Sequence, residues 1–152
     1  MNVLVVNGPN LNTLGEREPE IYGSESLAEL EERLLIQGAS LGAKLTFFQS
    51  NHEGKIIDLL QSAKKQHGII LNPGGLAYSS VSLRDCVAAL SVPVVEVHIT
   101  NIFAREDFRR NSLLAPVCRG LITGLGGDGY LLALRWLILR QEERIGPVEL
   151  VR

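Results

Sequence analysis

The sequence has few cysteines, few histidines and no long apolar run, and each scarcity excludes a class of protein. Cys86 and Cys118 lie far apart among apolar neighbours and form no CxxC pair, so we expect buried packing residues rather than a disulfide framework. The histidines His52, His67 and His98 show no ligand spacing, so no metal site is expected. The apolar runs fall far below the roughly 20 residues that span a bilayer, so no membrane partner is expected.

The excess of one sign of charge over the other is also small. The 152 residues carry a formal net charge of -2, and the basic residues form no long run. Nothing therefore favours a nucleic acid as the partner, and we expect a small-molecule ligand. Residues 2–6 are apolar, with no basic flank before them and no small-residue cleavage site after them. This pattern predicts a first strand rather than a signal peptide, and hence a cytoplasmic protein.

The length and the 45% apolar content allow one substantial core, so we expect a single domain over residues 1–152. Uniformly apolar, β-branched runs predict five strands that are buried on both faces, at residues 3–6, 45–48, 68–71, 92–97 and 120–123. Helical patterns separate them, at residues 27–41, 54–66, 80–89, 104–114 and 129–144. This alternation predicts an α/β fold, a flavodoxin-like doubly wound sheet of five parallel strands with helices on both faces.

In such a sheet the ligand binds beyond the carboxyl ends of the strands. The connection after the first predicted strand is unusual, because residues 7–23 exceed the common length of a βα loop. It carries two prolines, three glycines, Arg17 and Tyr22. We expect residues 8–23, approximately, to form a lid over the ligand.

A series of short motifs extends through nearly the whole chain. They are Asn-Gly-Pro-Asn at 7–10, Leu-Gly-Glu-Arg at 14–17, Tyr-Gly at 22–23, Gln-Ser-Asn-His-Glu-Gly at 49–54, Asn-Pro-Gly at 72–74, Leu-Arg-Asp at 83–85, Glu-Val-His-Ile-Thr-Asn at 96–101 and Arg-Glu-Asp-Phe-Arg-Arg at 105–110. In this order and at this spacing the chain resembles the type II 3-dehydroquinate dehydratases. That family eliminates water from 3-dehydroquinate through an enolate, without a metal, another cofactor or a covalent intermediate.

The resemblance implies roles for the residues that would carry this chemistry. Tyr22 corresponds to the base, and Arg17 to its cationic partner, which a phenol needs because its ordinary pKa is about 10. His98 corresponds to the acid that protonates the departing hydroxyl. Glu96 lies on the same strand face and would orient His98. Asn10 corresponds to the residue that holds water at the enolate oxygen.

The resemblance also implies a substrate-binding set. Asn72 and the backbone amides around Ile99 and Thr100 would hold the carboxylate and hydroxyl groups. Arg105 and Arg109 would share one helical face directed at the anionic substrate. Asp85 would be supplied by a neighbouring subunit, in a homo-oligomer of trimers assembled into a dodecamer.

The chain departs from the family pattern where Tyr78, Phe103 and Asn111 replace histidines. Tyr78 stands where the family histidine hydrogen-bonds the substrate's diol, and a phenol donates and accepts but does not become a cation near neutral pH. Lyase chemistry is therefore expected with a less certain substrate. The alternative is a non-catalytic or altered-specificity paralogue that binds a related polyhydroxy cyclic acid. A flavin carrier is disfavoured because the first loop is long and poor in hydroxyl groups.

Overall fold

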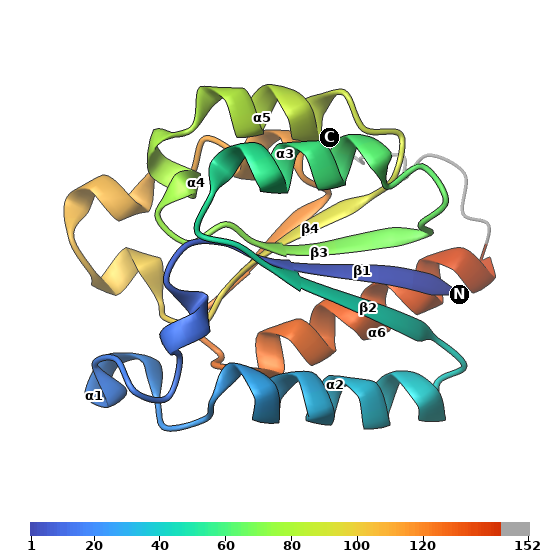
Figure 1. Ribbon diagram of the computed structural model, residues 1–152, viewed down its shortest axis with the longest axis horizontal. Helices are drawn as coiled ribbons and strands as arrows, with labels where there is room; N and C mark the ends of the chain where they lie inside the picture. The colour runs from blue at the N-terminus through green and yellow to red at the C-terminus, as the bar shows by residue number, and fades with distance from the viewer. Residues whose placement is uncertain (144–152) are drawn as a thin grey trace, which may run out of the picture.

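A computed structural model describes residues 1–143 as a parallel sheet between two layers of helices (Figure 1). The strand order is β2-β1-β3-β4-β5 and every pairing is parallel. The strands are β1 (Asn2–Asn7), β2 (Lys44–Gln49), β3 (Gly68–Asn72), β4 (Val94–His98) and β5 (Gly120–Thr123). The flavodoxin-like sheet predicted from the apolar runs is confirmed.

Side chains alternate across this sheet and divide the core in two. In β1, Val3 and Val5 pack on the face covered by α2 (Leu27–Ser40) and α6 (Asp128–Glu143). Leu4 and Val6 pack on the opposite face, against α3 (Glu53–Ser62) and α5 (Val81–Ala88). The central strands β1, β3 and β4 are buried on both faces as predicted. The edge strands β2 and β5 are partly exposed, so the prediction of burial on both faces is wrong for these two.

The helix signals in the sequence agree with the structure at α2. The Ser26 hydroxyl accepts from the Glu29 amide at 3.2 Å, and the Glu29 carboxylate accepts from the Ser26 amide at 2.7 Å, which forms the expected capping box. The long first connection is not structureless, because it contains the 3-10 helix η1 (Leu11–Thr13) and the short helix α1 (Pro19–Tyr22). A short helix α4 (Leu76–Ser79) precedes α5. The last residue of the predicted final helix, Arg144, lies outside the described residues.

The predicted helix at residues 104–114 is wrong. The 3-10 helix η3 (Asp107–Arg110) lies inside this segment, η2 (Ile102–Ala104) ends at its first residue and η4 (Ala115–Val117) follows it. Arg105 has extended backbone angles, φ -113° and ψ -160°, which end η2. Its side chain hydrogen-bonds Tyr22 and Thr100, outside the segment. These tertiary contacts override the weak local helix propensity.

The two cysteines differ in their burial. Cys86 is buried as predicted, whereas Cys118 is only partly buried, so the prediction of full burial is wrong for Cys118. Both are free thiols. Burial nevertheless raises the pKa of Cys118 to about 12, which keeps the thiol protonated near neutral pH.

The helices in the described part of the chain do not meet the requirements for a membrane span. Within residues 1–143, none combines the length and the apolar composition that crossing a bilayer requires.

Candidate active site

A cavity of about 120 Å³ lies at the carboxyl edge of the sheet. It is bounded by the loops that follow β1, β3 and β4, at the left of Figure 1. Of the twelve residues predicted for the site, ten line the cavity and an eleventh, Glu96, lies directly behind it. Those that line it are Asn10, Arg17, Tyr22, Asn72, Tyr78, His98, Ile99, Thr100, Arg105 and Arg109.

Tyr22 is the last residue of α1, and two guanidinium groups face its ring. Arg17 lies 5.3 Å from the ring centroid and Arg105 lies 5.1 Å from it. Arg105 Nη1 also donates a hydrogen bond of 2.9 Å to the Tyr22 hydroxyl, whereas Arg17 forms an exposed ion pair with Glu18. Two guanidinium groups therefore contact Tyr22, and the sequence reasoning missed the direct contact from Arg105.

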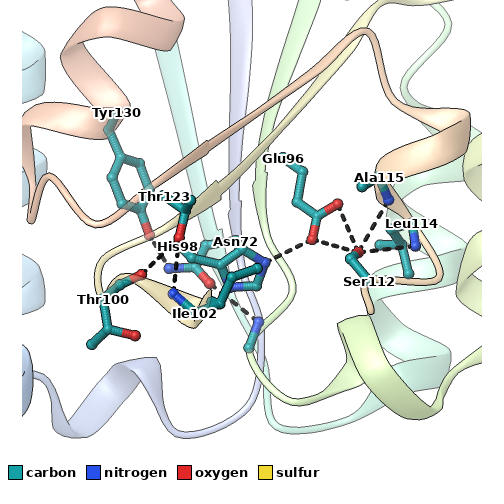
Figure 2. Close-up of polar contacts among 11 residues, drawn as sticks. Asn72, Glu96, His98, Thr100, Ile102, Ser112, Leu114, Ala115, Thr123 and Tyr130 are labelled. Atoms are coloured by element: carbon teal, nitrogen blue, oxygen red, sulfur yellow. Dashed lines mark hydrogen bonds and ion pairs between the residues drawn. The ribbon is translucent and has the colours of Figure 1, made fainter. Parts of the chain in front are cut away.

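The buried pair of His98 and Glu96 lies at the end of β4. His98 Nε2 is 2.6 Å from Glu96 Oε1, and the Glu96 side chain is fully buried. The placement of both residues on one strand face is confirmed, with Glu96 behind His98 and His98 at the cavity wall (Figure 2). Because the buried carboxylate and the imidazole contact each other, the orientation of the His98 ring is fixed.

Aromatic side chains form the wall of the cavity above His98. The Tyr78 ring stacks on His98 with centroids 6.0 Å apart, and Phe108 packs edge-on against Tyr78 at 6.3 Å. Arg109 lies over both outer rings, 5.7 Å from Tyr78 and 5.0 Å from Phe108. Burial raises the pKa of Tyr78 despite the nearby Arg109, so this phenol is neutral throughout the neutral range.

Behind Asn72 lies a buried polar network that sequence reasoning did not anticipate. Asn72 Nδ2 donates to the Tyr130 hydroxyl at 2.7 Å, and that hydroxyl donates to Asn7 Oδ1 at 2.6 Å. Asn72 Oδ1 accepts from the Gly74 amide at 3.1 Å (Figure 2). Tyr130 thus orients the Asn72 amide at the cavity, and the available signal was a tyrosine on an otherwise apolar helix face.

Removing the Tyr130 hydroxyl tests this network. In Tyr130→Phe, Asn72 Nδ2 and Asn7 Oδ1 lose a partner inside a dry site, so the free energy of unfolding should fall by about 1–3 kcal/mol. Chemical denaturation measures this change. The matched variant Tyr78→Phe removes a hydroxyl that is only partly buried and should lose less. Equal stability of Tyr130→Phe and the wild type would refute the structural role of the hydroxyl.

The floor of the cavity consists of two backbone segments in contact. The Gly8 amide donates to the Asn72 carbonyl at 2.7 Å. A Cβ atom at residue 8 would lie 2.5 Å from the Pro73 oxygen, and one at Gly74 would lie 3.0 Å from the Pro9 oxygen. Only glycine permits this approach, and the φ of 57° at Gly74 is a second reason for glycine there.

Asn10 follows this floor and also has a left-handed backbone, with φ 70°. Its amide donates to Asn51 Oδ1 at 2.9 Å. Asparagine tolerates the left-handed region better than most residues, which suits it to this turn. This turn places Asn10 among the residues that line the cavity, and its predicted role in holding water stays a prediction.

Two predictions about placement are corrected or remain open. Arg105 and Arg109 both line the cavity, but they do not share a helical face, because Arg105 is extended and Arg109 lies in η3. Asp85 does not line the cavity; its side chain is 63% exposed on α5 and pairs with Arg84. The predicted supply of Asp85 to a neighbouring subunit is not tested by a single chain.

Fold and site together define a class. A doubly wound parallel sheet with a cavity at its carboxyl edge, lined by a phenol, an imidazole and guanidinium groups, is typical of α/β enzymes that act on small anionic molecules. Comparison with known proteins specifies this further. Residues 1–138 match the family model described as dehydroquinase class II. The chain therefore belongs to the class II dehydroquinase family.

Named relatives cover almost the whole chain. The 3-dehydroquinate dehydratase of Bacillus licheniformis is 54% identical over 138 residues, which are 90% of this chain and 95% of the relative. That of Bacillus subtilis is 51% identical over 139 residues, 91% of this chain and 94% of the relative. The crystal structure of type II dehydroquinase from Butyrivibrio crossotus has a TM-score of 0.89 at 44% identity, covering 90% of this chain and 97% of the other.

Proposed function

We propose that this chain is a hydro-lyase that converts 3-dehydroquinate into 3-dehydroshikimate and water in the shikimate pathway. The observation that carries the proposal is one cavity lined by both Tyr22 and His98, with Arg105 bonded to the phenol and Glu96 bonded to the imidazole. This arrangement supplies a base and an acid to one small molecule. Membership of the dehydroquinase family supports the choice of substrate.

The proposed reaction proceeds through an enolate. The Tyr22 phenolate removes a proton from the carbon beside the ketone. The electron pair of that C–H bond becomes the C=C bond of the enolate, and the π pair of the carbonyl moves to its oxygen. Water held by Asn10 stabilises the enolate oxygen. When the ketone re-forms, the C=C pair of the enolate forms a new double bond to the next carbon and expels the hydroxyl group on that carbon. His98 protonates this hydroxyl so that it leaves as water.

The remaining cavity residues would hold the substrate. Asn72 and the backbone amides of Ile99 and Thr100 donate to its carboxylate and hydroxyl groups. Arg109 contacts a hydroxyl, and Arg105 supports both Tyr22 and the Thr100 hydroxyl, to which its Nη1 donates at 3.2 Å. Guanidinium groups on the cavity wall favour an anionic substrate over a neutral one.

The proposal extends to organisation and location. One catalytic domain comprises residues 1–152, with residues 8–23 as a lid, in a cytoplasmic protein. Trimers assemble into a dodecamer in which Asp85 of one subunit completes the site of its neighbour. The exposure of Asp85 in the single chain supports this role. Sedimentation analysis tests it, with an expected mass twelve times the 16.6 kDa of the chain.

An absorbance assay tests the function. Purified protein mixed with 3-dehydroquinate should produce the ultraviolet-absorbing conjugated enone acid of the product. A folded preparation that forms no product above background would refute the proposal. No observation favours the non-catalytic alternative suggested by Tyr78, and thermal stabilisation by 3-dehydroquinate without turnover is the result that would restore it.

Variants at Tyr78 test its predicted contact with substrate. Tyr78→Phe keeps the ring on His98 but removes the hydroxyl, so KM should rise by about three- to tenfold with little change in kcat. Tyr78→His should recover part of the lost affinity. Because imidazole ionises between pH 5 and 8 and the Tyr78 phenol does not, kcat/KM of Tyr78→His should acquire an additional pH dependence in that range. An unchanged KM in Tyr78→Phe would exclude the contact.

A further inference from the structure

Ser112 lies behind the acid of the proposed site, outside the cavity. Its hydroxyl oxygen is 2.7 Å from Glu96 Oε1 and 2.9 Å from Glu96 Oε2 (Figure 2). The same oxygen accepts from the amides of Leu114 and Ala115, each at 3.1 Å. One side-chain oxygen thus connects the turn before η4 to the carboxylate that contacts His98.

The number of protons and lone pairs on Ser112 decides the direction of these bonds. A serine hydroxyl has one proton and two acceptor sites. The two backbone amides occupy both acceptor sites, so the single hydroxyl proton must point at Glu96. Glu96 is therefore an acceptor toward Ser112. The Ser112 hydroxyl, held by the two amides of the turn, is thus a fixed hydrogen-bond donor to the buried Glu96 side chain.

We propose that Ser112 is a positioning residue that holds Glu96 as a hydrogen-bond acceptor and thereby fixes the tautomer of His98, an inference that rests on the proposed function for its kinetic consequence. With Glu96 accepting, His98 Nε2 must carry a hydrogen across the 2.6 Å contact. Nδ1 is then the ring nitrogen that gives its proton to the departing hydroxyl. Ser112 contacts neither substrate nor the reacting atoms.

Other ionisable groups near the pair do not replace this role. Tyr78 stacks on the His98 ring and is neutral, so it supplies no charge to Glu96. The Cys118 thiol is close enough to feel the charge of Glu96 but is protonated. Three guanidinium groups line the cavity, whereas Glu96 lies behind it, and they belong to Arg17, Arg105 and Arg109.

Kinetics of a variant form the first test. Ser112→Ala should lower kcat about tenfold with little change in KM, because a hydrogen bond to a charged group is lost. Because Glu96 is then held less firmly against His98, the pH profile of kcat should differ from that of the wild type. Ser112→Thr keeps the hydroxyl and should restore the profile. The control Ser62→Ala removes a hydroxyl that bonds only Leu59 and should behave as the wild type.

Nitrogen NMR of histidine-labelled protein is the second test, and it needs neither activity nor a variant. In the ligand-free wild type at alkaline pH, His98 should be neutral with its hydrogen on Nε2. An Nδ1-protonated His98, or an unchanged pH profile in a folded Ser112→Ala, would overturn the proposal. Absence of lyase activity in the wild type would refute the proposed function alone, because the NMR result is independent of it.

Discussion

Tyr22→Phe should lower kcat by about 10²- to 10⁴-fold, the contribution typical of a positioned base. The variant retains the aromatic ring between Arg17 and Arg105 and loses only the hydroxyl that accepts from Arg105 at 2.9 Å. Substrate binding should change little, because the ring still fills the same wall. Steady-state kinetics with 3-dehydroquinate, combined with binding of the substrate to the inactive variant, separate the two effects.

The matched control is Tyr78→Phe, which removes a phenolic hydroxyl from the same cavity. It should affect KM, whereas Tyr22→Phe should affect kcat. This contrast distinguishes a base from a residue that only binds. Wild-type turnover by a folded Tyr22→Phe would exclude Tyr22 as the base.

His98→Gln should reduce kcat by about 10²- to 10⁴-fold as well, without loss of the fold. A glutamine amide can donate to Glu96 in place of Nε2, which keeps the buried carboxylate paired, but it holds no transferable proton at neutral pH. Kinetics at several pH values should show that the dependence on protonated His98 disappears with the activity. Normal turnover in this variant would remove His98 from the mechanism.

His98→Ala is the companion variant, and it should differ in stability. It leaves Glu96, which is fully buried, without its partner on the cavity side. Removing one hydrogen-bond partner of a buried polar group costs about 1–3 kcal/mol of unfolding free energy, while Ser112 still donates to Glu96. Urea denaturation of the two variants therefore separates the chemical role of the imidazole from its role as a partner for Glu96.

The sequence predicted the sheet well because its central strands β1, β3 and β4 are buried on both faces. In a chain whose extended and helical patterns alternate, a short continuous apolar run such as residues 68–71 indicates a strand covered by helices on both sides. The capping box of α2 is equally local, since Ser26 and Glu29 bond each other. Such features depend on neighbours in sequence, and they were recovered almost to the residue.

Features that depend on distant contacts were not recovered. In residues 104–114 the apolar and polar side chains alternate at spacings that are compatible with a helix. The Arg105 side chain, however, hydrogen-bonds Tyr22, which belongs to the connection after β1. The contacts of Tyr130 with Asn7 and of Ser112 with Glu96 likewise join separate elements. No local pattern encodes them, because a hydroxyl's partner is decided by the packing of the whole chain.

The backbone floor at Gly8 and Gly74 limits how the enzyme can be redesigned. Tyr78, which lines the cavity with its side chain, can be shortened to admit a bulkier acid. No side chain can be shortened at Gly8 and Gly74, because the backbone atoms of the two segments are already in direct contact there. A broader substrate range must therefore be sought at the aromatic wall, where enlargement also uncovers the imidazole that the wall covers.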